Sequence, residues 1–349
     1  MRIPASAAAV LALTTAPVLA APQVVTDLVP TGALVQEVMG DLGEVRVLLP
    51  QGASAHHYQM RPSDAQALQS ADLVVWMGPA LTPWLARASD TLGGSEQLRL
   101  LEVDGITLRG YADAAADDHE AHGHDDGHGH DDHAHDDAHA HHDDHDHDHD
   151  HAHDHDHDHD HDHGDHDHGD HDHAHTGTDP HAWLSPANAG PWLEAIAATL
   201  SEQDPDNAAT YRANADAAAA RIAALDTQLR DRLAPHADDR FVVFHDAYGY
   251  FTTHFGLQPA MAVSLGDAST PSAARIDQIR TQISQTGARC AFPEYAHDDS
   301  LIATVIEGTG TRLGGELSPE GGMLAPGAGQ YDALLTGLAD TIVACLSAE

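Results

Sequence analysis

The segment from Asp117 to His175 limits most strongly how this chain can fold. Its 59 residues comprise 25 histidines, 23 acidic residues, 6 alanines and 5 glycines, with no arginine and no large apolar side chain. Such a composition cannot bury enough apolar surface to offset the entropy lost on ordering, so we expect disorder in the absence of metal. The segment must therefore be an insert in a chain whose other parts form the folded core.

The rest of the chain has an ordinary composition. The formal net charge is −41 at pH 7, and without the 23 acidic residues of the insert it becomes −41 + 23 = −18. A length of 349 residues with 42% hydrophobic residues is enough for two domains with real cores. All 15 basic residues are arginine. Nucleic-acid binding is disfavoured because phosphates are held by clustered basic residues, and cations are the better partner.

Residues 1–20 are typical of an export signal. Arg2 precedes a short apolar run from Ala7 to Leu13, and the small residues Val18 and Ala20 precede a cut after Ala20. The run is too short to span a bilayer, which disfavours a membrane anchor. We therefore predict an exported protein whose signal peptide is cleaved near Ala20.

Export affects the interpretation of the two cysteines. Cys290 and Cys345 are the only pair, and an exported chain can form a disulfide where a cytosolic chain usually cannot. We expect a bond that joins the last helix to a core strand. Two buried thiols are the alternative. Zinc binding by these residues is disfavoured because the chain has no CxxC spacing.

Short β-branched runs alternate with amphipathic helical patterns in two parts of the chain. This alternation predicts parallel βα units, and hence an α/β fold with two lobes. The first series has strands expected at 24–26, 45–49, 73–77 and 98–101, with helices at 31–39, 62–68 and 81–88. The second series has strands expected at 241–244, 261–264 and 290–292, with helices at 271–285 and 331–346.

A long helix is expected to join the lobes. One helix begins at Ser185 and Pro186, and a longer one follows Asp204 and ends at Pro235. At 1.5 Å per residue the second helix is roughly 40 Å long, a stiff strut that would limit hinge opening. The predicted boundaries are a signal peptide (1–20), the first lobe (21–116 and 176–203), the insert (117–175), the linking helix (204–235) and the second lobe (236–349).

Three of the seven histidines outside the insert share one context. His56, His181 and His245 each follow an expected strand or lie in a tight loop before a helix. Ligands of open α/β sheets gather beyond the carboxyl ends of strands, so these loops are candidates to converge between the lobes. Neutral imidazole nitrogens suit zinc, and three of them with one further donor complete a tetrahedron.

The remaining histidines are expected to have structural or solvent-exposed positions. We predict that His254 is packed or at the surface, that His236 is solvated in a polar turn, and that His57 points away from a metal bound by His56. Asp246 and Glu294 are candidate acceptors that fix the tautomer of a ligating ring.

Four collinear blocks carry a family resemblance that covers nearly the whole chain after residue 20. They read GASAHHYQMRPSD (52–64), ADLVVWMG (71–78), HAWLSP (181–186) and FHDAYGYF (244–251), and the acidic histidine insert lies between the second and the third. Together they resemble the zinc-specific periplasmic binding proteins of ABC-type importers. Any one block alone would be a weak signal.

The resemblance implies two α/β lobes joined by a rigid backbone helix, with Zn²⁺ bound in the cleft between them as the transported ligand. The three histidine ligands of the family fall on His56, His181 and His245. A third imidazole in place of a carboxylate favours zinc over manganese. The resemblance further implies a periplasmic location, a monomer, and an inner-membrane ABC permease with its ATPase as partners.

The fourth ligand varies within this family. Some relatives have an acidic residue directly before the first histidine, but Ala55 cannot bind a metal. Others use a carboxylate from a late loop, where this chain offers Glu294. Water, His57 and His297 remain alternatives.

We therefore expect a receptor that captures Zn²⁺ and passes it to a permease, with no enzymatic activity. The sequence has no HExxH helix and no nucleophile–base pair. A periplasmic zinc buffer or chaperone is one alternative, and a zinc hydrolase with Glu294 as its base is another. The insert is expected to assist zinc capture rather than act only as a solubilising spacer, and to lose metal below about pH 6 because imidazole titrates near 6.5.

Overall fold

The computed structural model describes residues 21–92, 94–111, 177–325 and 327–348. The predicted signal peptide (1–20) and the predicted disorder of the insert (117–175) lie outside the described residues. Both β-sheets described below belong to one compact unit of the structure. Among the described residues, no helix combines the length and the apolarity needed to cross a membrane.

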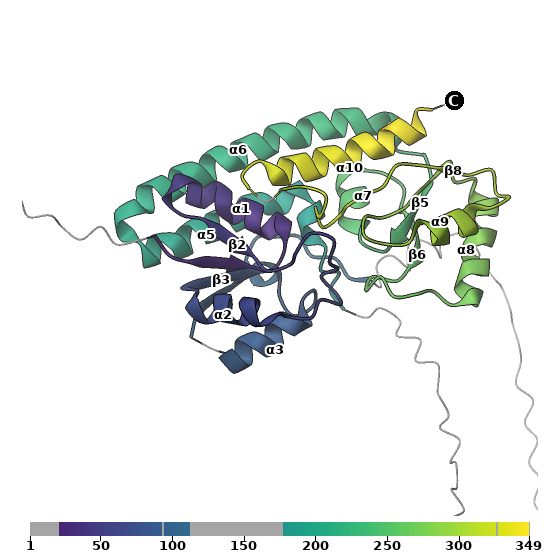
Figure 1. Cartoon of the computed structure of the whole chain (residues 1–349). Helices are drawn as coiled ribbons and strands as arrows, with labels where there is room; N and C mark the ends of the chain where they lie inside the picture. Colours follow the sequence, from purple (N-terminus) through teal and green to yellow (C-terminus); the bar gives the residue numbers. More distant parts are fainter. Residues whose placement is uncertain (1–20, 93, 112–176, 326, 349) are drawn as a thin grey trace, which may run out of the picture. The chain divides into compact units, whose positions relative to one another are not determined.

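The first sheet consists of four parallel strands in the order β2-β1-β3-β4 (Figure 1). The strands are β1 (Val24–Thr26), β2 (Val45–Val47), β3 (Leu73–Trp76) and β4 (Glu96–Arg99). Alternate residues of β3 enter two apolar clusters, with Leu73 and Val75 in one and Val74 and Trp76 in the other. Because both faces of the central strands are buried, their sequences are continuously apolar.

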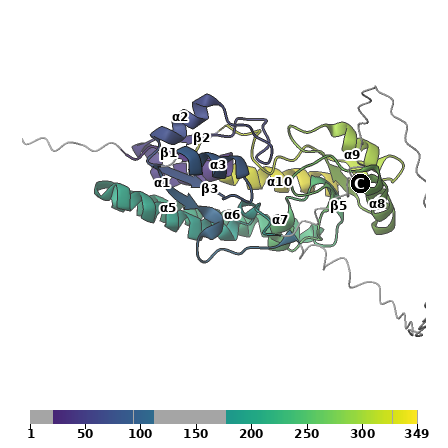
Figure 2. The same ribbon diagram turned by 90° about the horizontal axis from the view of Figure 1, so that it is seen from below.

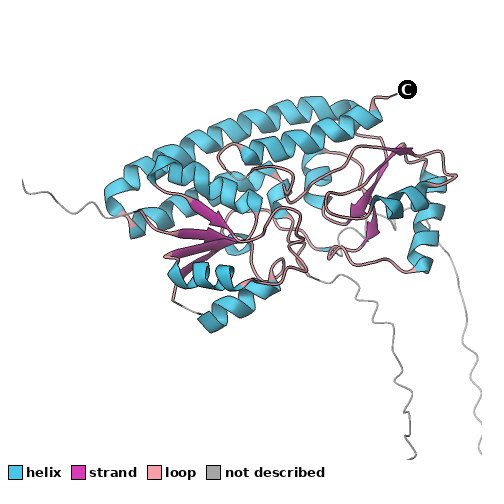
Figure 3. Ribbon diagram, in the orientation of Figure 1, coloured by secondary structure: helices cyan, strands magenta, loops and turns pink. Residues whose placement is uncertain are grey.

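Helices cover both faces of this sheet, as Figure 3 shows. α1 (Val29–Met39) contributes to the same cluster as Leu73, whereas α2 (Pro62–Ser70) and α3 (Pro83–Leu92) contribute to the cluster of Val74. α5 (Ala189–Gln203) packs against α1.

The second sheet repeats the topology of the first, with parallel strands in the order β6-β5-β7-β8. The strands are β5 (Phe241–His245), β6 (Met261–Ser264), β7 (Cys290–Phe292) and β8 (Arg312–Leu313). The helices are α7 (Gly249–Phe255), α8 (Ala273–Thr286), α9 (Asp299–Ile306) and α10 (Gln330–Leu346). The predicted α/β fold with two parallel sheets is confirmed.

The predicted linking helix is α6 (Ala208–Leu233), with short 3₁₀ turns at 205–207 and 234–236. α10 packs along α6 and also contacts α1, and Figures 1 and 2 both show α6 and α10 beside each other. Arg221 of α6 forms ion pairs with Glu37 of α1 at 2.9 Å and with Asp332 of α10 at 2.7 Å. Two helices, α6 and α10, therefore connect the half of the structure that contains the first sheet to the half that contains the second.

The predicted disulfide is present between Cys290 and Cys345, with an S–S distance of 2.00 Å. It joins the core strand β7 to the carboxyl-terminal turns of α10. The end of the second connecting helix is thus covalently fixed to the second sheet.

Several predicted element boundaries are wrong. The helix expected at 81–88 is α3, Pro83–Leu92, and the strand expected at 45–49 ends at Val47. Residues 186–188 form a 3₁₀ turn, so α5 begins at Ala189 and not at Ser185. The Ser185 hydroxyl does not cap the helix, because it contacts Nδ1 of His254 at 3.2 Å. β4 begins two residues earlier than predicted, and residues 100–102 form a 3₁₀ turn.

The prediction that His236 is solvated is also wrong. Its side chain is buried, with Nδ1 2.8 Å from Oδ2 of Asp239 and Nε2 3.2 Å from the hydroxyl of Ser347. Both ring nitrogens have protein partners, which a polar turn in the sequence does not reveal. His254 is packed as predicted, with Nε2 2.7 Å from Oδ1 of Asp226.

Candidate metal centre

His245 and Glu294 meet because their strands are neighbours. His245 is the last residue of β5, and Glu294 follows the end of β7 by two residues. The two strands pair in parallel with Val243 opposite Phe292, so the same register places His245 beside Glu294. Nδ1 of His245 is 2.7 Å from Oε2 of Glu294. The pair therefore lies at the carboxyl ends of two adjacent strands, which is where open α/β sheets usually bind their ligands.

His181 is held by a carboxylate two residues before it. Asp179 is fully buried, and its Oδ1 accepts hydrogen bonds from the backbone N–H of His181 at 3.0 Å and from Nδ1 of its ring at 2.8 Å. Arg109 lies 3.4 Å from Oδ2 of Asp179 and balances its charge. The Asp-Pro-His turn therefore fixes both the backbone and the ring of His181.

His56 is brought to the centre by the loop that follows β2. Its backbone N–H donates to the hydroxyl of Ser54 at 3.3 Å, and the N–H of Ala55 donates to both carboxylate oxygens of Glu320 at 3.3 Å. Trp84 Nε1 donates to the carbonyl of Ala55 at 2.8 Å. Nε2 of His56 is buried and has no hydrogen-bond partner among the described residues.

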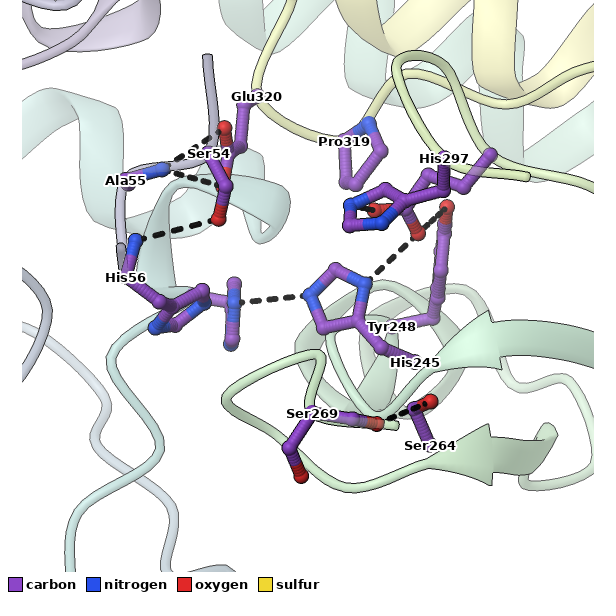
Figure 4. A network of polar contacts seen from close by, with 12 residues as sticks. Ser54, Ala55, His56, His245, Tyr248, Ser264, Ser269, His297, Pro319 and Glu320 are labelled. Atoms are coloured by element: carbon purple, nitrogen blue, oxygen red, sulfur yellow. Dashed lines mark hydrogen bonds and ion pairs between the residues drawn. The ribbon is translucent and has the colours of Figure 1, made fainter. Parts of the chain in front are cut away.

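The three histidines converge, as the sequence suggested. One ligand atom from each of His56, His181 and His245 lies within 4.8 Å of the others. Nε2 of His181 is 3.4 Å from Nε2 of His245, the contact drawn to His245 in Figure 4. Two ligands of one tetrahedral zinc ion, each about 2.0 to 2.2 Å from the metal, are roughly 3.3 to 3.6 Å apart. The spacing of these nitrogens therefore fits a shared metal ion.

The carboxylate partners also determine which nitrogen of each ring is free. Asp179 and Glu294 accept from Nδ1 of His181 and His245, so the Nε2 lone pairs of the neutral rings face each other. A cation between them would remove this repulsion. Carboxylates that orient ligating imidazoles in this way are general in zinc sites.

Burial and charge set the protonation of the rings. Burial, together with the neighbouring imidazoles, holds the pKa values of His56 and His181 well below the ordinary value of 6.5. Burial also lowers the pKa of His245, but the charge and the hydrogen bond of Glu294 outweigh it and raise the net pKa above 6.5. Two rings are therefore ready to bind metal at neutral pH, whereas His245 keeps its proton to a higher pH than an ordinary imidazole does.

Three polar residues of the centre were not identified from the sequence. Asp179 carries a sequence signal, since an acidic residue two positions before a candidate ligand can turn back onto its ring. Tyr248, whose hydroxyl donates to Oε2 of Glu294 at 3.3 Å, lies in a recognised block but was given no role. Burial and the charge of Glu294 raise the pKa of Glu320 to about 7. Glu320 lies in a glycine-rich turn near the end of the chain, and its distance in sequence from the other site residues does not predict its role.

The other candidates for the fourth position lie outside the histidine group. Nε2 of His57 contacts the carbonyl of Asp267 at 2.9 Å, so this ring is directed away from the centre as predicted. Oε2 of Glu294 is already bonded to His245, and its Oε1 is 3.6 Å from Nε2 of His297. Glu294 accepts from Nδ1 of His245, as expected of a residue that fixes the tautomer of this ring, and its role as a direct ligand stays a prediction.

Solved structures share this fold. The chain matches "Crystal structure of ZnuA" with a TM-score of 0.67 and 20% identity, covering 93% of this chain and 99% of that one. The periplasmic zinc binding protein TroA from Treponema pallidum matches with a TM-score of 0.67 and 18% identity over the same shares. At these identities the likeness concerns the fold alone.

Curated sequences are much more similar. A high-affinity zinc uptake system protein ZnuA from Paracoccus denitrificans is 54% identical over 329 residues, which cover 94% of this chain and 93% of that protein. A protein of the same name from Brucella suis is 39% identical over 325 residues, covering 93% and 91%. The family model described as "Zinc-uptake complex component A periplasmic" matches residues 24–345. The chain therefore belongs to the family of periplasmic zinc-uptake component A proteins.

Proposed function

We propose that this protein is a periplasmic receptor that binds Zn²⁺ with His56, His181 and His245 and delivers it to an ABC permease driven by its ATPase. The facing Nε2 atoms of His181 and His245, 3.4 Å apart, are the observation that carries the proposal. Nε2 of His56, which is buried and has no hydrogen-bond partner in the described part of the chain, supplies a third nitrogen. Membership of the zinc-uptake family supports zinc as the cargo and a receptor rather than an enzyme.

For the fourth position we propose that Glu294 acts mainly through His245, and that water or the Glu320 carboxylate completes the tetrahedron. The hydrogen bond from Nδ1 of His245 occupies Oε2 of Glu294, which supports this assignment. Absorption of the Co²⁺-loaded protein separates the roles. Loss of a direct ligand in Glu294→Gln or Glu320→Gln changes the d–d spectrum, whereas loss of an acceptor weakens binding without altering the ligand set.

A competitive zinc titration tests the receptor function against a periplasmic zinc buffer. The intact protein, a form lacking residues 117–175 and His181→Ala are compared, with His236→Ala as a control because His236 bonds to Asp239 and Ser347. A receptor has one tight site that survives deletion of the insert and is lost in His181→Ala. Loss of all tight binding with the insert would favour the buffer.

An activity assay addresses the hydrolase alternative. A catalytic zinc site keeps an open position and needs a free general base. Glu294, the base considered for this role, is bonded to His245 and Tyr248. Turnover of ester or amide substrates by the zinc-loaded protein that disappears in His245→Ala would contradict the receptor assignment.

Export and the insert complete the proposal. We propose that cleavage near Ala20 releases a monomer into the periplasm, where the 25 histidines of the insert raise the local concentration of zinc. Amino-terminal sequencing of the mature protein tests the cleavage site, and sedimentation of the zinc-loaded protein tests the monomer.

A further inference from the structure

A polar pocket lies next to the residues that hold His56 and His245. Its lining comes from three loops, at residues 52–54, 294–297 and 318–322. Glu294, which is bonded to His245, and Glu320, which is bonded to the loop of His56, both line it. The pocket therefore borders the loop of His56, and two carboxylates that contact the metal centre line it.

Glu294 connects this pocket to the metal centre. Its Oε2 accepts from Nδ1 of His245 at 2.7 Å, and its Oε1 is 3.6 Å from Nε2 of His297. The second distance is longer than a charge-assisted hydrogen bond, about 2.7 to 2.9 Å. It lies in the range of roughly 3.3 to 3.6 Å that separates two ligands of one zinc ion. The spacing of Nε2 of His297 and Oε1 of Glu294 thus fits two donors of one metal ion, next to His245.

The position of His297 is fixed by its surroundings. Its ring packs on Phe244, with ring centroids 4.3 Å apart and planes 30° from parallel. Its backbone N–H donates to the carbonyl of Glu294 at 3.1 Å. Ala296, directly before it, has a φ of 67°, a left-handed conformation that is unfavourable for a residue other than glycine. A strained turn therefore directs His297 back toward Glu294.

His297 also remains accessible. Its side chain is 21% exposed, whereas that of His245 is 1% exposed and that of His181 is fully buried. Its ring centroid is 6.5 Å from that of His245, and in Figure 4 it lies between His245 and Pro319, which lines the same pocket. A cation bound at His297 would therefore lie close to the buried ring of His245.

We propose that His297 and Glu294 form a transient binding site for a hydrated divalent cation on its way to and from the three imidazoles. The inference rests on the proposed function and adds a path to it. Two protein donors, with water in the remaining positions, bind weakly enough to pass the ion on. Carboxylates in a cleft raise the local cation concentration, which increases association rates by roughly 10- to 1,000-fold.

Stopped-flow kinetics of the full chain tests this site. Trp183, whose ring centroid is 5.2 Å from that of His181, reports zinc at the buried centre by fluorescence. A chelator buffer fixes the free Zn²⁺ concentration whatever the insert binds, and an excess of chelator gives the dissociation rate. The variants are His297→Ala and His297→Phe, of which the second keeps an aromatic ring on Phe244. His236→Gln is the matched control, because His236 also pairs with a carboxylate in the second half of the chain.

A site on the path accelerates binding and release equally. Both variants should therefore lower the association and dissociation rates severalfold and by a similar factor, with an unchanged Kd. Unchanged rates, or an equal loss in His236→Gln, would overturn the proposal. Faster dissociation with a raised Kd would also overturn it, because His297 would then be a ligand of the tight site. The proposed receptor function is tested separately by the zinc titration. It would be contradicted if the parent protein had no tight zinc site, or if His181→Ala left that site intact.

Discussion

Replacing Asp179 with asparagine tests whether a buried carboxylate organises the metal centre. Asp179 is fully buried and accepts from both the backbone N–H and the ring Nδ1 of His181. Asparagine has nearly the same shape but no charge, and its amide group can reverse and offer N–H to the ring. His181 would then lose both the tautomer and the orientation that direct Nε2 toward His245.

The expected loss of zinc affinity follows from this role. Removing a carboxylate that orients a ligating histidine weakens metal binding by about 10- to 100-fold, or about 1.4 to 2.7 kcal/mol. Stability of the metal-free protein should not fall in parallel. Burial raises the pKa of Asp179 from 3.8 to about 6. Its contribution to stability is therefore greatest below pH 3.8 and declines as the pH rises through 6, and a neutral asparagine avoids this loss at pH 7.

The assay combines competitive zinc titration with thermal unfolding of the metal-free protein. Asp239→Asn is the matched control, because Asp239 also accepts from a histidine Nδ1, that of His236, at 2.8 Å. We expect weaker zinc binding in Asp179→Asn alone. A folded Asp179→Asn variant whose Kd stays within about twofold of the parent would refute the role of the carboxylate, since the expected loss is at least tenfold.

Three further predictions address the fold, the proton balance and the insert. Replacing Cys290 and Cys345 with serine removes a cross-link over a sequence separation of 55, and urea unfolding should show a loss of about 4 kcal/mol; a loss below about 1 kcal/mol would contradict this. Because Glu294 raises the pKa of His245 above 6.5, zinc binding at pH 6.5 should release protons from this ring, and calorimetry in two buffers should find less release in Glu294→Gln. Lowering the pH from neutral to about 5.5 should remove zinc from the insert, whose histidines titrate near 6.5. The centre should keep its zinc, because the pKa of His181 is held below that value; equal zinc content of the protein at neutral pH and at pH 5.5 would contradict this prediction.

The alternation of strands and helices was predictable because the central strands are buried on both faces. β3 is apolar throughout and β5 is apolar up to its last residue, His245, since neighbouring residues face different clusters. β8 was missed because it has two residues, both exposed. α9 was missed because eight residues give a short helical pattern, although Asp298 caps it through the N–H of Ser300. Burial on both faces leaves a sequence signal, and a short edge strand does not.

The three histidines were predictable from their positions after strands and in tight loops. Their partners required tertiary information. The pairing of His245 with Glu294 depends on the register between β5 and β7, which the sequence does not specify. The contact of Glu320 with Ala55 joins residues separated by 265 positions. Ligands that follow strands are visible in the sequence, whereas the groups that orient them depend on which strands are neighbours.

The connections between the two halves explain why the imidazoles already face each other. One apolar cluster extends from β1 and α1 through α5 and α6 to β5 and α10. The loop of His181 is fixed from the other half of the chain as well, because Trp183 Nε1 donates to the carbonyl of Pro319 at 2.7 Å and Tyr331 donates to the carbonyl of Trp183 at 2.6 Å. Ligands held in place before the metal arrives lose little conformational entropy on binding, so affinity is high. The same rigidity slows release, and delivery to a permease must therefore disturb a contact that fixes these loops, of which Trp183 to Pro319 is the most direct.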